Sequence, residues 1–283
     1  MVGSTIRRTR FAPSPTGLLH LGHAFAALTA AQQADPKQFL LRIEDIDRER
    51  CKPDYEAAIY EDLQWLGLSW PQPVLRQSDR MAAYEAALKQ LAPLTYPCRC
   101  RRGDIRAALS APQEGALPAG PDGLVYPGTC RGRTMDDIGA DDVIRLDAAR
   151  AFDALGVNQI QFHDEIVMPG RPHAISRTQF LDRIGDVILS RRGMGTSYHL
   201  AVVIDDGLQG VSVVTRGKDL FDSTWIHVLL QKLLKLPTPR FHHHHLIRDT
   251  AGKRLAKRDD ARAIRHFRQD GATPADIRRM IGL

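Results

Sequence analysis

The sequence predicts an α/β protein built on a parallel sheet, and three observations support this prediction. Patterns typical of strands and of helices alternate between residues 9 and 91, which favours helices that cross over a parallel sheet. In a chain of 283 residues, the 43% of side chains that are hydrophobic can form a sizeable core. Between residues 96 and 177 the alternation is interrupted by loops rich in Gly and Pro, which indicates an insertion between two halves of the sheet domain.

The first half of the predicted sheet domain is defined by short apolar runs and amphipathic segments. Strands are expected at Thr9–Ala12, which ends at prolines, and at Phe39–Ile43. The helical spacing of apolar residues predicts helices at His20–Ala34, Asp54–Leu68 and Asp79–Leu91. The order strand, helix, strand, helix predicts parallel strands.

The α/β alternation is predicted to resume at residues 186–189, after the insertion and its short strands at Val143–Leu146 and Gln159–Met168. Apolar runs predict further strands at Tyr198–Asp205 and Val211–Thr215. The sequence therefore predicts four parts: residues 1–95 and 181–245 as the two halves of the sheet domain, 96–180 as an inserted subdomain, and 246–283 as a short helical module.

The last part is strongly basic. From Leu246 onward there are ten Lys or Arg and five Asp or Glu, and ten minus five leaves five of the net six positive charges there. Such a module is expected to face a polyanion such as RNA or a phosphorylated substrate, although a solvated helical face would have the same composition.

The composition also limits the compartment and the covalent chemistry. No apolar run is long enough to span a membrane, and the N-terminus lacks the apolar stretch of a secretory signal. The four cysteines, two of them in one Cys-x-Cys, favour metal binding or reduced thiols over a disulfide framework. We therefore expect a cytoplasmic protein without a membrane partner.

The strongest signal is the run RFAPSPTGLLHLGH from Arg10 to His23. Two histidines three apart are a weak signal by themselves, because surface or capping histidines have the same spacing. The whole run, however, resembles the HIGH signature of class I aminoacyl-tRNA synthetases in the glutamyl and glutaminyl subclass. Three further segments resemble that subclass: LRIEDIDRER from Leu41, YHLAVVIDD from Tyr198 and VTRGKDL from Val214.

A second signature of that family lies more than two hundred residues later. The run GKRLAKR from Gly252 resembles a degenerate KMSKS loop, in which Lys257 is kept while Arg254 and Ala256 depart from the pattern. The alternative reading is an ordinary basic loop. The resemblance covers about residues 7–262 and implies a Rossmann-like class I synthetase domain that uses ATP with Mg²⁺.

Activation of a carboxylic acid by ATP depends mainly on positioning and on cations near the phosphates. At the start of the predicted first helix, Gly22 lets a nucleotide approach the backbone, and His20 and His23 can point toward one phosphate. The resemblance assigns ATP binding to these three residues and to Lys257, and catalysis to His20, His23 and Lys257.

The family's amino-acid pocket, carried over residue by residue, falls on Arg10, Ser14, Glu44, Tyr198 and Arg216. Glutamate carries two carboxylates and an ammonium group. Each arginine can form a bidentate pair with a carboxylate, and Glu44 can hold the ammonium. An alternative for Glu44 is an ordinary acidic residue at a strand end.

The insertion carries a candidate metal site. Cys98 and Cys100 are one residue apart and can bind one Zn²⁺, Cys130 can complete most of a tetrahedron, and these spacings leave the fourth ligand open. The resemblance to shortened members of the family, which carry CxC followed by YxxxC, implies that Tyr126 is the fourth ligand and that the zinc is structural. Three reduced cysteines in a loop-rich segment remain the alternative.

The anticodon-binding domain expected after the second signature is absent from this sequence, which makes the chain similar to the glutamyl-queuosine tRNA(Asp) synthetases. That resemblance implies activation of L-glutamate by ATP, transfer of the glutamyl group to queuosine in the anticodon stem-loop of tRNA(Asp), and a monomer. Two alternatives remain: a minimal glutamyl-tRNA synthetase that charges a tRNA 3′ end, and a non-catalytic RNA- or nucleotide-binding paralogue.

Overall fold

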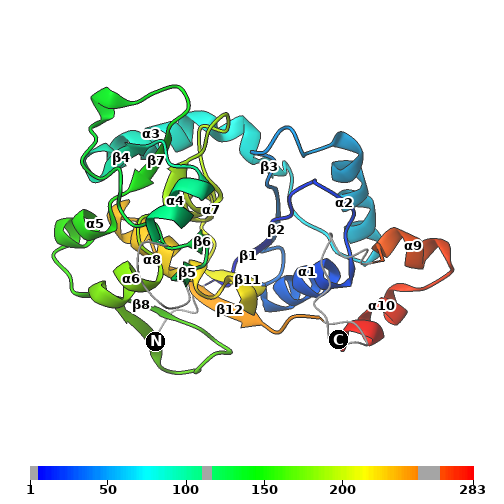
Figure 1. Ribbon diagram of the computed structural model, residues 1–283. Helices are drawn as coiled ribbons and strands as arrows, with labels where there is room; N and C mark the ends of the chain where they lie inside the picture. Colours follow the sequence, from blue (N-terminus) through cyan, green and yellow to red (C-terminus); the bar gives the residue numbers. More distant parts are fainter. Residues whose placement is uncertain (1–5, 110–116, 248–261) are drawn as a thin grey trace.

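The computed structural model describes residues 6–109, 117–247 and 262–283 (Figure 1). The predicted parallel sheet is present. In its first half, β1 (Thr9–Phe11), β2 (Phe39–Ile43) and β3 (Leu75–Arg76) are parallel neighbours. The connections between them contain α1 (Leu21–Gln33) and α2 (Pro53–Trp65), as the alternating pattern predicts.

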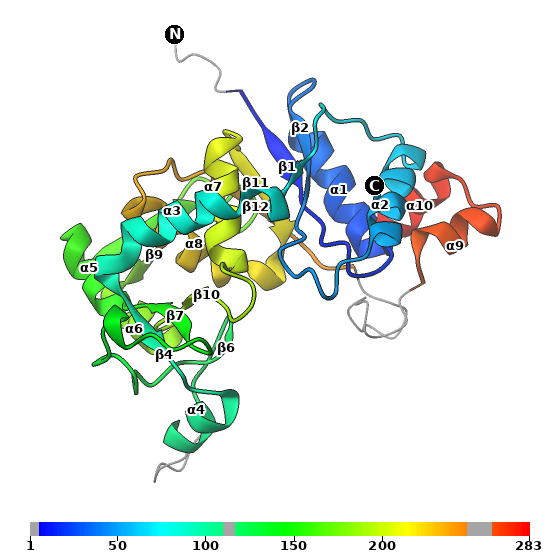
Figure 2. The ribbon, with the colours of Figure 1, turned by 90° about the horizontal axis from the view of Figure 1, so that it is seen from above.

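The second half of the sheet domain contains a second parallel pair, β11 (Val213–Gly217) and β12 (Arg240–His244), joined through α8 (Ser223–Leu233). The backbone carbonyl of Arg8 accepts hydrogen bonds from the amides of Ser212 and Val213 at 3.0 and 3.1 Å. These bonds place the beginning of β11 beside the beginning of β1, so that segments two hundred residues apart form one layer (Figures 1 and 2).

The sequence-based assignment of residues 198–205 to a strand is wrong, because α7 covers Tyr198–Leu208. The Ser197 side chain begins this helix by accepting a hydrogen bond from the amide of Leu200. Most of the helix is buried, so its apolar residues form a continuous run without a helical period. A short continuous apolar run does not distinguish a buried helix from a buried strand.

The insertion has a sheet of its own, in which β7 (Val143–Leu146) lies between β4 (Thr95–Cys98) and β10 (Ile188–Ser190), all antiparallel. The strand β10, at the start of the predicted second half, therefore extends the sheet of the insertion, since it pairs with β7. The backbone amide of Leu146 donates to the carbonyl of Val187 at 2.9 Å, which ties the returning chain to the insertion.

The other elements of this half surround these strands. They are α3 (Met81–Leu91), α4 (Arg102–Leu109), β5 (Ala119–Gly120), β6 (Gly123–Leu124), α5 (Ala148–Leu155), β8 (Gln159–His163), β9 (Pro172–Ser176) and α6 (Arg177–Arg183). The pairs β5–β6 and β8–β9 are antiparallel hairpins.

Two helices, α9 (Ile264–Gln269) and α10 (Pro274–Ile281), form the C-terminal part. Their buried Ile264, Ile277 and Ile281 belong to the same apolar cluster as the inner face of α1. In both views these helices lie beside α1 and α2, at the opposite end of the molecule from the insertion (Figures 1 and 2). None of the described helices is long and apolar enough to cross a membrane.

Asp62 lies where α2 meets α9, and its side chain is buried. No described residue donates a hydrogen bond to its carboxylate, and the closest described cation, the Nη1 of Arg268, is 3.9 Å from Oδ1. Burial raises the pKa of Asp62 to about 6, although Arg268 and Arg265 oppose the shift. The folded protein therefore binds this proton more tightly than the unfolded chain does, and stability falls as the pH rises through about 6.

We predict that Asp62→Asn raises the melting temperature at pH 7.5 by about 2 °C or more, because it removes a buried charge. The difference from the unmodified protein narrows as the pH falls below the pKa of Asp62. Asp54→Asn, in the exposed first turn of the same helix, is the control and gives no rise, since a carboxylate there favours the helix. A lower melting temperature for Asp62→Asn at pH 7.5 would contradict the prediction.

Candidate functional site

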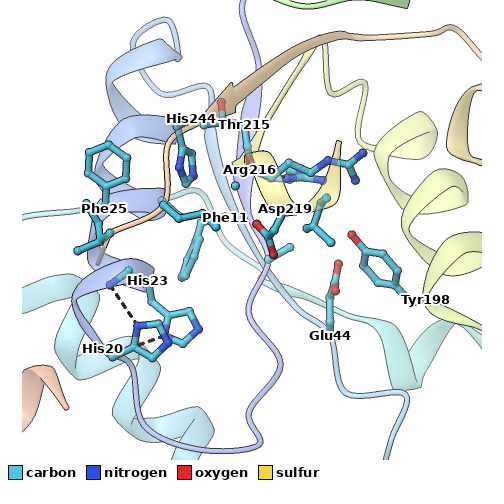
Figure 3. A pocket seen from close by; sticks show the side chains of 18 residues that line it. Phe11, His20, His23, Phe25, Glu44, Tyr198, Thr215, Arg216, Asp219 and His244 are labelled. Atoms are coloured by element: carbon cyan, nitrogen blue, oxygen red, sulfur yellow. Dashed lines mark hydrogen bonds between the residues drawn. The ribbon is translucent and has the colours of Figure 1, made fainter. Parts of the chain in front are cut away.

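A cavity of about 350 Å³ opens at the carboxyl ends of β1, β2 and β11, beside the beginning of α1. Ligands bind at this edge in open parallel sheets, because the strand ends and the helix N-termini converge there. Figure 3 shows side chains from both halves of the fold around this space. Seven of the predicted site residues line it: Arg10, His20, Gly22, His23, Glu44, Tyr198 and Arg216.

Two of the predicted site residues do not join this group. Ser14 lies in the loop between β1 and α1 and is not among the described residues that line the cavity. Lys257 lies outside the described residues, as does the whole second signature. Their proposed contacts with substrate stay predictions.

The two signature histidines form the beginning of α1. The Nδ1 atom of His20 accepts a hydrogen bond from the amide of Gly22, and the Nδ1 atom of His23 accepts one from the amide of His20, both at 3.1 Å. Because each Nδ1 is an acceptor, each neutral ring carries its proton on Nε2. The rings lie 3.8 Å apart, and the first turn contains no acidic residue, so the helix N-terminus can attract phosphate.

Arg10 is held by a carboxylate within the fold. Its Nε and Nη2 atoms donate to the two oxygens of Asp206 at 3.1 and 3.2 Å, and Nη1 of the buried Arg42 donates to the same carboxylate at 2.7 Å. Desolvation opposes the ionised carboxylate, but the two guanidinium groups hold the pKa of Asp206 below its usual value. Arg42 also donates to Glu44 at 3.3 Å, while burial raises the pKa of Glu44.

Arg216 is in a different situation from Arg10. It donates from Nε to Nε2 of His243 at 3.2 Å, from Nη1 to Nδ1 of His227 at 3.0 Å, and from Nη2 to the hydroxyl of Thr224 at 2.7 Å. Among the residues that the structure describes, no carboxylate lies within ion-pair distance of this guanidinium. Burial and the nearby Arg10 lower the pKa of Arg216, which means that the charged form is destabilised by desolvation. An anion in the cavity would stabilise this charge.

Sequence reasoning missed the residues that hold these arginines. Asp206 and Arg42 both stand inside the segments quoted for the resemblance, but nothing in their spacing showed that they pair. His227 carried no signal, because a histidine in an amphipathic helix is usually structural. His243 is fixed by Asp164, which lies 79 residues earlier and accepts from Nδ1 at 2.5 Å.

The predicted metal ligands converge in the insertion. The sulfur atoms of Cys98, Cys100 and Cys130 lie within 4.8 Å of one another, and those of Cys100 and Cys130 are 3.5 Å apart. The Tyr126 hydroxyl lies 3.3 Å from the sulfur of Cys98 and 3.5 Å from that of Cys100. A tetrahedral site with metal–sulfur bonds of about 2.3 Å has edges of about 3.8 Å, so this donor set fits one metal ion.

Two of these four donors resist ionisation in the absence of a cation. Burial raises the pKa of the Cys100 thiol to about 11 and also raises the pKa of the Tyr126 phenol. A bound metal would favour the deprotonated forms. The metal would stabilise the insertion, since the cluster joins β4 to the loop that follows β6.

The matches with known proteins agree with this geometry. Residues 7–122 and 157–283 match the family model for the catalytic domain of class I tRNA synthetases (E and Q). A glutamyl-Q tRNA(Asp) synthetase from Rhodobacter capsulatus is 56% identical over 97% of this chain and 99% of its own length. Another from Albidiferax ferrireducens is 39% identical over 90% and 85% of the two chains.

Among solved structures, a glutamate–tRNA synthetase from Elizabethkingia anophelis matches with a TM-score of 0.67 and 26% identity over 95% of this chain. The chain spans only about half of that synthetase, 54% of its length. The chain belongs to the class I tRNA synthetases for glutamate and glutamine and, within them, to the family of the glutamyl-Q tRNA(Asp) synthetases.

We predict that Cys100→Ser removes about one bound metal ion per chain, measured by elemental mass spectrometry after purification without chelator, and lowers the melting temperature. Cys51→Ser is the matched control, because Cys51 lies after β2, outside the cluster, and its replacement leaves the metal content unchanged. Equal metal content in the two variants, or none in the unmodified protein, would contradict the metal site.

Proposed function

We propose that this protein activates L-glutamate with ATP, forming glutamyl-adenylate and pyrophosphate, and transfers the glutamyl group to queuosine in the anticodon loop of tRNA(Asp). The observation that carries the activation step is a single cavity that combines a helix N-terminus for phosphates with a buried guanidinium that lacks a carboxylate partner among the described residues. The near full-length similarity to the Rhodobacter enzyme supports the choice of acceptor.

In this proposal Arg216 binds a carboxylate of glutamate, because its charge is compensated by neutral acceptors alone. Glu44 holds the ammonium group, whose arrival would favour the ionised form that burial disfavours. Tyr198 adds a hydroxyl from α7 and Ser14 one from the loop after β1. Arg10 acts mainly through the field that it shares with Asp206, since most of its donors are already engaged.

The phosphates of ATP are assigned to the beginning of α1. His20, Gly22 and His23 lie where the aligned amides of the helix attract negative charge. Lys257 is proposed to reach the same phosphates from the second signature. Mg²⁺, carried by ATP, supplies further positive charge for the departing pyrophosphate.

We assign the metal in the insertion as Zn²⁺, because three thiolates and one oxygen donor in a tetrahedral arrangement suit zinc better than Mg²⁺ or Ca²⁺. Its proposed role is structural. The sheet of the insertion is small, and a metal that binds both β4 and the loop after β6 would fasten a segment that has little core of its own.

Two basic surfaces support an RNA partner, proposed to be the anticodon stem-loop of tRNA(Asp). A second cavity, in the insertion, is lined by Arg101, Arg102, Arg106, Arg191 and Arg192, and α9 and α10 carry most of their charge as arginine. Clustered arginines favour phosphate backbones. A monomeric state and a cytoplasmic location belong to the same proposal.

The direct test is transfer of labelled glutamate to tRNA(Asp) prepared with and without queuosine, followed by nuclease mapping. We predict label in the anticodon fragment, and only when queuosine is present. Label at the 3′-terminal adenosine would identify a minimal charging enzyme instead. Absence of both label and glutamate-dependent pyrophosphate exchange would point to a binding protein.

A further inference from the structure

The guanidinium of Arg216 is connected to the insertion by a chain of hydrogen bonds. Its Nη1 donates to Nδ1 of His227 in α8, and Nε2 of His227 lies 3.0 Å from Nδ1 of His199 in α7. Nε2 of His199 lies 3.0 Å from both carboxylate oxygens of Asp122. The chain thus runs from the wall of the substrate cavity to the turn between β5 and β6.

The direction of every bond in this chain is fixed by chemistry. A guanidinium can only donate, so Nδ1 of His227 must accept and Nε2 of the neutral ring must carry the proton. The Nε2–H group of His227 donates a hydrogen bond to Nδ1 of His199. The proton of the neutral His199 ring is therefore on its Nε2 atom. The carboxylate of Asp122 accepts a hydrogen bond from this Nε2–H group, so the chain of hydrogen bonds ends at a negative charge.

The directions of these hydrogen bonds matter because both histidine rings are buried. The side chains of His199 and His227 are buried, whereas that of Asp122 is 38% exposed. Burial and the neighbouring Arg216 lower the pKa of His227 well below its usual value, which keeps the ring neutral and able to accept. A buried ring with an unmet donor is destabilised, so the acceptor at the end of the chain stabilises one tautomer of both rings.

A second support holds the other side of the same guanidinium. His243 accepts from Nε of Arg216 and donates from Nδ1 to Asp164, so it too is an imidazole oriented by a carboxylate. Asp164 is buried beside β12, where it forms a parallel bridge with Phe241, while Asp122 lies in the turn of the β5–β6 hairpin. Arg216 is therefore fixed between two carboxylate–histidine systems, one of which begins in the β5–β6 hairpin.

We propose that Asp122, acting through His199 and His227, is a positioning residue for Arg216 and for the substrate carboxylate that Arg216 binds. The inference rests on the proposed function for the identity of that carboxylate as glutamate. It assigns to the insertion a part in the amino-acid site, in addition to any contact with RNA. Without Asp122, the Nε2–H group of His199 has no fixed acceptor, so each of the two rings can move its proton from Nε2 to Nδ1. His227 with its proton on Nδ1 could no longer accept a hydrogen bond from Arg216.

The test is glutamate-dependent ATP–pyrophosphate exchange with Asp122→Ala, Asp122→Asn and the control Asp141→Ala, an exposed aspartate of the same insertion. We predict that Asp122→Ala raises the KM for glutamate at least fivefold while kcat and the KM for ATP change less than twofold. Asp122→Asn should recover most of the affinity, because its amide oxygen can still accept from His199. Kinetics of Asp122→Ala equal to those of Asp141→Ala would overturn the proposal.

A spectroscopic measurement separates this proposal from the proposed function. In ¹⁵N-histidine spectra of the unmodified protein, His199 and His227 should both carry the proton on Nε2, and Asp122→Ala should alter both signals. If the unmodified protein neither binds nor activates glutamate, the proposed function fails, and a tautomer change in Asp122→Ala still supports the positioning of Arg216. Spectra that are identical in the two proteins would overturn the relay whatever the substrate is.

Discussion

The site depends on one constraint, which is that a buried positive charge must be held without being neutralised. Arg10 and Arg42 share the carboxylate of Asp206, so each of these buried guanidinium groups contacts a carboxylate. Arg216 instead donates to two imidazoles and one hydroxyl, which satisfy its hydrogen bonds and leave its charge in place. An anionic ligand can supply the missing charge, so the fold is prepared for a carboxylate before one arrives.

The fold makes this arrangement possible by bringing distant segments to one edge. Arg10 lies in β1, Glu44 follows β2, and Arg216 lies in β11, so parallel strands bring all three side chains to one cavity. Beside them, α1 begins with two histidines whose Nδ1 atoms accept hydrogen bonds from backbone amides. Carboxylate and phosphate binding are thereby placed next to each other, as acyl-adenylate formation requires.

Much of this architecture could be predicted from the sequence, since local signals define it. Proline and glycine bound the first strands, and α1 follows a capping histidine, so Thr9–Phe11, Phe39–Ile43 and Leu21–Gln33 lie close to the predicted positions. The metal cluster also has a local component, the Cys98-x-Cys100 pair. Seven predicted residues of the site line one cavity, and the resemblance of their segments to a known family identified them.

The wrong strand assignment and the missed contacts have a common physical cause, because tertiary contacts leave no local pattern in the sequence. The helix at Tyr198–Leu208 is buried on most sides, so its sequence lacks the period that marks a surface helix. Pairing of Arg10 with Asp206 spans 196 residues, and the contact between Asp122 and His199 spans 77. Such contacts follow from the packing of the sheet, α7 and the insertion, and residue spacing does not reveal them.

The most direct test of the central claim compares the binding of glutamate and glutamine by calorimetry in the unmodified protein and in Arg216→Gln. The two ligands have nearly the same shape but differ by one negative charge. If the uncompensated charge of Arg216 pairs with the side-chain carboxylate of glutamate, the unmodified protein binds glutamate at least tenfold more tightly than glutamine, and Arg216→Gln loses most of this preference. Equal affinities in the unmodified protein, or an unchanged preference in a folded Arg216→Gln variant, would contradict the account.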